Sequence, residues 1–142
     1  MKQLKLSNQL CFSFYALSRL VTSHYQPLLA PLDLTYPQYL VMLALWGEDA
    51  LSVKALGQRL MLDSGTLTPL LKRLEAKKLI KRVRSKEDER VVHIHLSAAG
   101  KQLQQQAADI PEKMSCSMGF TETEYNTLKP MIDQILKRHA NE

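Results

Sequence analysis

Two cysteines, Cys11 and Cys116, are the residues of this chain with the most distinctive chemistry. A cysteine thiolate is a nucleophile that peroxides oxidise to a sulfenic acid, and a second thiol can convert that acid to a disulfide. Helical periodicity places Cys11 on the flank of an apolar stripe, one turn before Tyr15. A free cysteine among aromatic residues is most often a small buried hydrophobe. The residues alone therefore leave both an inert role and a redox role open.

A second kind of chemistry is concentrated between Lys72 and Arg90. Nine of the nineteen Lys and Arg residues fall in this segment, against four acidic residues. Such a local excess of positive charge suits the phosphates of a nucleic acid, although most charged runs are simply solvated surface. The elements that carry the charge decide between these readings.

Those elements are a helix followed by a hairpin. Leucines at 67, 70, 71 and 74 have the spacing of one buried helical face, with Asp63 or Ser64 as the cap. The outward face is expected to carry Thr66, Lys72, Arg73 and Lys77. Residues 79–83 and 90–96 flank a charged tip at 85–89, which predicts two paired strands. A helix sized for the major groove beside a basic hairpin predicts a winged helix-turn-helix that binds duplex DNA.

The DNA contacts are expected at the start of this helix and in the hairpin. A helix N-terminus directs backbone N–H groups at phosphates or base edges. Arg90 can enter a narrow minor groove while Asp88 holds its guanidinium, although an ordinary surface ion pair is the alternative. The expected contact residues are Ser64, Gly65, Thr66, Thr68, Lys72, Arg73, Arg82, Asp88 and Arg90.

The rest of the chain predicts further helices. The first covers 7–29 and is ended by Pro31, and the second covers 36–47. A short helix follows Ser52, a Gln-rich helix begins at Ser97, and a last helix is capped by Thr121 with Glu124. This places Cys116 between the last two helices. We expect one domain of 142 residues, mainly α with a small β-hairpin wing. Residues 36–97 form the DNA-binding unit, and 1–35 with 98–142 pack against a second copy as a dimerisation region.

Composition excludes several classes of protein. The chain carries a net charge of +5 with 45% apolar residues, so it can bury a core without metal or disulfides. It contains no run of roughly 20 apolar residues and no signal-peptide pattern, so we expect a cytoplasmic protein without membrane contact. His93 and His95 share one strand face but lack further ligands at metal-binding spacing, so no metal or cofactor is expected.

The segment DSGTLTPLLKRLEAKKLIKRVRSKEDERVVHIHLSAAG resembles the MarR family, in which a D-x-R pair in the wing is followed by a strand and L-[ST]-x-x-G. Three further motifs, NQLCFSFYALSR, LTYPQYLVMLALW and LDSGTLTPLLKRLE, are similar to the organic hydroperoxide resistance regulators of that family. The likeness covers nearly the whole chain. It implies a homodimeric repressor on a palindromic operator, with an organic hydroperoxide as its inducer.

The resemblance also implies roles for individual residues. Cys11 matches the peroxide-reactive cysteine, and Tyr25 and Tyr36 match tyrosines that donate hydrogen bonds to it. Cys116 matches the region of a second cysteine that forms an intersubunit disulfide in two-cysteine members. The candidate walls of a peroxide pocket that favours alkyl tails are Phe14, Tyr15 and Leu17.

Other readings stay open at this stage. Cys11 could be capped by a small thiol instead of Cys116, or be inert in a regulator that binds an aromatic or phenolic ligand. A thiol peroxidase is a rival from another class, but nothing around Cys11 resembles a peroxidase loop, so we do not expect an enzyme. A metal sensor and a winged helix that binds proteins are weaker alternatives.

Overall fold

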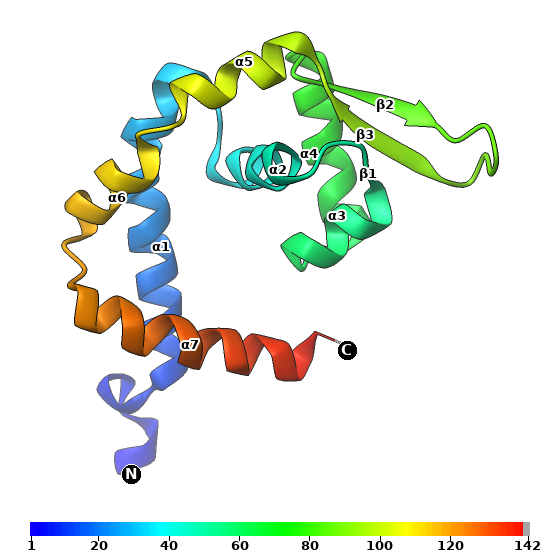
Figure 1. The fold of residues 1–142 in the computed structure, drawn as a ribbon. Helices are drawn as coiled ribbons and strands as arrows, with labels where there is room; N and C mark the ends of the chain where they lie inside the picture. The colour runs from blue at the N-terminus through cyan, green and yellow to red at the C-terminus, as the bar shows by residue number, and fades with distance from the viewer. Residues whose placement is uncertain (141–142) are drawn as a thin grey trace.

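The structure, a computed structural model, describes residues 1–140. This part of the chain contains seven α-helices and three short strands (Figure 1). The helices are α1 (Leu10–Leu29), α2 (Tyr36–Gly47), α3 (Val53–Leu60), α4 (Ser64–Ala76), α5 (Ala98–Gln106), α6 (Ile110–Met118) and α7 (Glu122–His139). The strands are β1 (Leu51–Ser52), β2 (Ile80–Arg84) and β3 (Val92–Leu96).

Polar side chains fix where several helices begin. The Ser52 hydroxyl accepts a hydrogen bond from Ala55 N at 3.0 Å, and an Asp63 carboxylate oxygen accepts one from Thr66 N at 2.7 Å. Thr121 forms the predicted capping box at the start of α7. These bonds satisfy N–H groups that have no partner within the helix. The predicted starts of α3, α4 and α7 are therefore confirmed.

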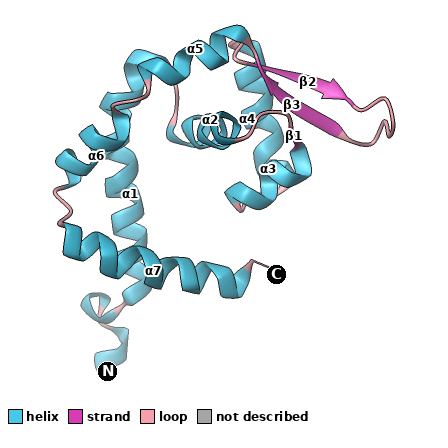
Figure 2. Ribbon diagram, viewed as in Figure 1, coloured by secondary structure: helices cyan, strands magenta, loops and turns pink. Residues whose placement is uncertain are grey.

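The strands form one antiparallel sheet in the order β1-β3-β2 (Figure 2). Ile94, in the central strand, pairs with Leu51 on one side and Arg82 on the other. The predicted hairpin of β2 and β3 is confirmed. Strand β1 was not predicted because its two residues are too few to show an alternating pattern. It joins the base of the hairpin to the start of α3.

A single core holds the sheet against α2, α3 and α4. The four leucines of the predicted stripe on α4 are all buried, at most 9% exposed, and they meet Met42, Leu56 and Ile94, which are fully buried. The hairpin projects beyond this core as a wing (Figure 1). The fold class is confirmed as mainly α with a small β wing on a winged helix-turn-helix.

Helix α1 forms an arm that extends away from this core (Figure 1). Residues 10–20 are all exposed, and the helix becomes buried only at Leu29. Two short 3-10 turns precede it, so the regular helix begins at Leu10 rather than at residue 7. No single described helix is long and apolar enough to span a membrane; Leu10–Leu32 and Tyr36–Gly47, bent by 70°, meet that test only as a pair.

The region between α5 and α7 corrects the sequence analysis. It was expected to separate two helices, but it forms a helix of its own, α6, which begins with Pro111 in its first turn and ends at Gly119 in a left-handed conformation, φ 66°. Proline fits a first turn, and glycine adopts positive φ without strain. Cys116 therefore lies within a helix and not between two helices. Helix α6 packs along α1.

Candidate DNA interface and redox site

The N-terminal turn of α4 presents small polar residues to solvent. Ser64, Gly65 and Thr66 are exposed, and Thr68 is half-buried. The Asp63 carboxylate caps this turn, and its hydrogen bonds from the backbone and side chain of Thr66 hold the pKa of Asp63 below its usual value. The turn is thereby capped and open to solvent, which suits a helix that enters the major groove.

Farther along α4, two of the three expected outward cations are exposed. Lys72 and Arg73 are exposed, and they follow Thr68 and Thr66 at spacings of four and seven residues, which place them on the same face of α4. Lys77 was expected on this face too, but that expectation is wrong. Its ammonium group bonds to the backbone carbonyl of Asp33 and to Gln38 Oε1 at 3.0 Å. Lys77 therefore points toward the linker between α1 and α2.

The wing carries the paired residues Asp88 and Arg90. Asp88 Oδ1 accepts hydrogen bonds from Arg90 N and Nε, both at 3.1 Å, and Oδ2 accepts one from the other arm of the guanidinium at 3.2 Å. These bonds hold the pKa of Asp88 below its usual value, so the pair stays ionised until the pH falls below the normal carboxyl range. The Arg90 side chain is 90% exposed, so it is both oriented and accessible.

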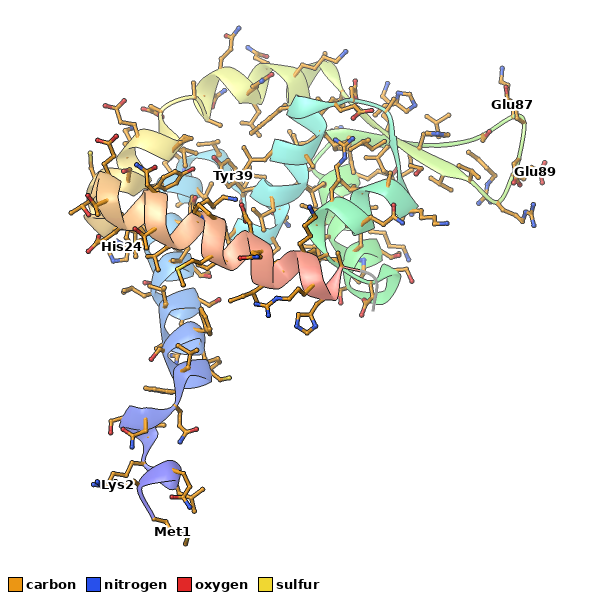
Figure 3. The ribbon with its side chains drawn as sticks, turned by 60° about the horizontal axis from the view of Figure 1, so that its bottom comes forward. Met1, Lys2, His24, Tyr39, Glu87 and Glu89 are labelled. Carbon is orange, nitrogen blue, oxygen red and sulfur yellow. The ribbon has the colours of Figure 1, made fainter. Side chains whose placement is uncertain are left out.

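The tip of the wing places acidic residues outermost. Figure 3 shows Glu87 and Glu89 at its outer end, away from the helices. The backbone carbonyl of Glu89 accepts a hydrogen bond from Arg84 at 2.7 Å, which closes the turn from inside. The tip therefore carries two acidic residues beside its one exposed lysine, Lys86, whereas Arg82, Arg84 and Arg90 lie nearer to the helices or at the base of the tip.

Arg82 has a structural partner as well as exposed surface. Its backbone N–H and its Nε donate to the two carboxylate oxygens of Glu75 on α4, both at 3.3 Å. This ion pair joins the wing to the last turn of the helix. Arg82 also lines a cavity of about 420 Å³ with Arg90 and Lys54. Lys54, in the first turn of α3 and two residues after the Ser52 cap, was not among the residues expected from the sequence.

Cys11 lies near the start of the α1 arm and is exposed. The expected pocket residues Phe14, Tyr15 and Leu17 are 44%, 61% and 36% exposed. They share the arm with Cys11, but a single chain does not enclose a pocket around them. Within a single chain Cys11 is therefore exposed and not a buried hydrophobe. Any further walls of a peroxide pocket would have to come from another chain.

The two expected thiolate-supporting tyrosines lie together at the other end of α1. The rings of Tyr25 and Tyr36 are stacked, with centroids 4.4 Å apart and an interplanar angle of 21°. Burial raises the pKa of each phenol, so both stay protonated at neutral pH and can donate hydrogen bonds. Their role toward Cys11 stays a prediction.

Within one chain, however, this pair is remote from Cys11. Cys11 and Tyr25 lie on the same helix, separated by fourteen residues, or about 21 Å at 1.5 Å per residue. Phenols at that distance do not reach the Cys11 sulfur. The structure therefore does not bring Cys11 and the two tyrosines together within a single chain.

Cys116 is exposed on α6, next to Ser117. The hydroxyl of Ser117 forms a hydrogen bond with His24 Nδ1, which fixes α6 against the tyrosine end of α1. His24 lies thirteen residues from Cys11 on α1, or about 20 Å at 1.5 Å per residue, so Cys116 is far from Cys11 of its own chain. A disulfide needs Cα atoms within about 7 Å, so these two cysteines cannot pair within one chain. Both cysteines are free thiols in this structure.

The histidine pair on β3 gains no further ligands. His93 and His95 are half-buried and lie on one face of the strand, opposite Val83 and Lys81 of β2. Within residues 1–140, no group of three or more His, Cys, Asp or Glu side chains is arranged to hold a metal ion.

Comparisons with known proteins identify the family. The family model described as transcriptional regulator SarA/Rot matches residues 23–107. The organic hydroperoxide resistance transcriptional regulator of Bacillus subtilis is 56% identical over 108 residues, which are 76% of this chain and 74% of that protein. The chain belongs to the MarR family, in its organic hydroperoxide resistance branch. This confirms the resemblance seen in the sequence.

Solved structures support the same assignment. Reduced AbfR bound to DNA is similar with a TM-score of 0.82 and 37% identity, over 100% of this chain and 99% of that chain. AbfR, a protein of Staphylococcus epidermidis, is also similar in its disulfide form, with a TM-score of 0.66 and 38% identity over 95% of each chain. At nearly equal identity, the conformation of this MarR family member is closer to the reduced form.

The family assignment establishes the general activity. The relatives are transcriptional regulators and not enzymes, so this MarR family member is a DNA-binding transcriptional regulator. The exposed start of α4, the cations beside it and the Asp88–Arg90 pair are the features of the structure suited to that task.

Proposed function

We propose that this protein is a homodimeric repressor that acts in the cytoplasm, binds a palindromic operator when reduced, and releases it when an organic hydroperoxide oxidises Cys11. Membership of the organic hydroperoxide resistance branch supports this role. AbfR exists as a reduced DNA complex, in a disulfide form, and in an overoxidised form bound to DNA. These forms support a thiol switch in which the disulfide, and not oxidation of a thiol alone, causes release.

A second copy of the chain is supported by the apolar surface of the first and last long helices. Large exposed apolar residues gathered on a helix mark an interaction site. A twofold axis lets the same surface cover itself, which is the commonest arrangement for dimers. The exposed large apolar residues are Leu10, Phe12, Phe14, Tyr15, Leu17 and Leu20 on α1, and Tyr125, Leu128, Met131, Ile135 and Leu136 on α7.

The observation that carries the proposal is the separation between Cys11 and the stacked tyrosines. When two α1 arms cross in opposite directions about a twofold axis, the Cys11 end of one lies beside the tyrosine end of the other. Tyr25 and Tyr36 of the partner subunit then donate hydrogen bonds to Cys11, and these bonds favour its thiolate. The same crossing brings Cys11 toward the α6 helix of the partner subunit, where Cys116 of the partner subunit is exposed.

The chemistry follows from these positions. The Cys11 thiolate attacks one peroxide oxygen, the O–O bond breaks, and the products are a sulfenic acid and, after proton uptake, an alcohol. The thiol of the partner's Cys116 then attacks the sulfenic sulfur, a disulfide forms and water leaves. Overall the peroxide gains two electrons and the two thiols lose them. Apolar neighbours on the arm, Phe14, Tyr15 and Leu17, favour peroxides with an alkyl tail.

Release of DNA would follow from a change in geometry. A dimer reads two half-sites, so the two α4 helices must match the spacing of successive major grooves. Formation of the disulfide displaces the arms relative to one another and changes that spacing. A shift of a few ångströms therefore lowers the affinity of both half-sites together.

Operator binding before and after oxidation tests the proposal. An operator duplex is selected from random DNA with the reduced protein, and its Kd is measured again after one equivalent of cumene hydroperoxide. Wild type should be released, whereas Cys11→Ser should remain bound because it has no thiol to oxidise. Release of Cys11→Ser to the same extent would show that the sensor lies elsewhere. Retention of oxidised wild type on the operator would contradict a peroxide switch altogether.

A further inference from the structure

Lys77 occupies an unexpected position at the junction of the sensor and DNA-binding regions. It is the C-cap residue of α4, yet its side chain turns away from the DNA face toward the linker that joins α1 to α2. The ammonium group bonds to the backbone carbonyl of Asp33, lies 3.6 Å from the Asp33 carboxylate, and bonds to Gln38 at 3.0 Å. The ammonium therefore makes two hydrogen bonds and one ion pair, all of them to the linker or to the start of α2.

The acceptors of Lys77 belong to the segment that contains Tyr36. Thr35 and Gln38 form a capping box at the start of α2: Gln38 Oε1 accepts from Thr35 N at 3.1 Å, and Gln38 N donates to Thr35 Oγ1 at 3.3 Å. Tyr36 lies between them and stacks on Tyr25. Gln38 is only 3% exposed, so its amide oxygen is shared by Thr35 and Lys77 without competition from solvent. A displacement of Tyr36 therefore moves an acceptor of Lys77.

On the other side, Lys77 lies close to both DNA-binding elements. It ends α4, and β2, the first strand of the wing, begins three residues later at Ile80. The linker side of the contact is also fixed, because Asp33 has a left-handed backbone, φ 53°, and ends a 3-10 turn. One side chain thus ties the end of the recognition helix to the backbone beside the tyrosine pair.

We propose that Lys77 is a positioning residue that couples the sensor to DNA reading: it transmits a displacement of Tyr36, through Gln38 and Asp33, to the C-terminal end of α4 and to the wing. This inference rests on the proposed function, because it assumes that oxidation at Cys11 disturbs the tyrosines. Lys77 does not contact DNA in this role. Its removal changes the affinities of the reduced and oxidised states unequally, so that their ratio changes.

The test measures the operator Kd of the full-length protein in its reduced and oxidised states. The ratio of the oxidised Kd to the reduced Kd is then compared among variants. Lys77→Met removes the ammonium and keeps an apolar stem of similar length, Lys77→Arg keeps the charge, and Lys78→Met removes the same charge from the adjacent exposed residue. We expect Lys77→Met to reduce the ratio by about tenfold, within the usual range of coupling between sites. Lys77→Arg and Lys78→Met should keep the wild-type ratio. Mass spectrometry of Cys11 confirms equal oxidation of each variant.

A second variant approaches the same link from α2. Gln38→Met removes the shared acceptor, and if Lys77 acts through Gln38, Lys77→Met should add little to the loss that Gln38→Met already causes. An unchanged ratio in both single variants, or an equal weakening of both redox states, overturns the inference and leaves Lys77 a structural residue. Wild type separates the two proposals: if oxidised wild type stays bound, the proposed function fails, whatever the variants do.

Discussion

The indole N–H of Trp46, on α2, donates a hydrogen bond to the backbone carbonyl of Gly100, on α5, at 2.9 Å. This bond joins the DNA-binding unit to the first helix that follows the wing. The start of α5 lies close to the backbone of Leu79 at this point, because a Cβ built at Gly100 would lie 2.2 Å from the carbonyl oxygen of Leu79. A glycine at this position of the L-S-x-x-G sequence is therefore a packing requirement.

Gly100→Ala should destabilise the protein by about 1–3 kcal/mol, since the added methyl group has to displace backbone. Urea unfolding at a fixed protein concentration measures the change. Gly47→Ala is the matched control, because a Cβ at Gly47 meets no heavy atom within 4 Å, and its free energy of unfolding should stay near wild type. Equal effects of the two substitutions would show that Leu79 is not the obstacle.

The separation of Cys11 from the tyrosine pair predicts complementation between subunits. Cys11→Ser homodimers should not react, and Tyr25→Phe/Tyr36→Phe homodimers should react slowly with cumene hydroperoxide, because their thiolate lacks its donors. A mixed dimer of the two variants contains one complete site, formed by the Cys11 of one chain and the tyrosines of the other. Stopped-flow measurement of thiol loss should therefore show half the wild-type amplitude at the wild-type rate. A mixed dimer that reacts only at the slow rate would place the tyrosines in the same chain as the cysteine.

The orientation of α6 predicts which thiol can resolve the sulfenic acid. Cys116→Ser should leave the oxidation rate of Cys11 unchanged but abolish the covalent dimer on a non-reducing gel. Cys116→Ser/Ser117→Cys moves the thiol by one residue, toward His24 of its own chain. This control should also form no covalent dimer, because one residue turns the side chain about 100° around the helix. A covalent dimer that persists in Cys116→Ser would contradict the disulfide model.

Local signals in the sequence predicted much of this fold. The capping pair Thr121 and Glu124 acts within one turn, so three residues suffice to recognise it, and the buried stripe of α4 repeats often enough to be unambiguous. Helix α6 was missed although Pro111 and Gly119 mark its ends. Proline and glycine were read as interruptions, but at the first turn and the C-cap of a helix they are favourable.

Contacts between distant segments were beyond the sequence. Helical periodicity places Lys77 outward, but the left-handed turn at Asp33 brings the linker within reach of its ammonium group. The stacking of Tyr25 on Tyr36 depends on the same turn. The exposure of Cys11 follows from how far the arm extends beyond the core, and periodicity carries no information on that length.

The wing offers a test that separates positioning from bulk charge. Arg90→Ala should weaken operator binding and lower the slope of log Kd against log salt by about 0.9 for each Arg90 that contacts a phosphate. Lys113→Ala, on α6 and paired with Asp109, removes the same charge elsewhere and should leave the slope unchanged.

Asp88→Asn is the sharper variant. It makes the protein more positive, so charge alone predicts tighter binding, whereas loss of the bonds that orient Arg90 predicts weaker binding with little change in slope. Fluorescence anisotropy across a salt series measures both quantities, and a gain in affinity for Asp88→Asn would refute the positioning role of Asp88.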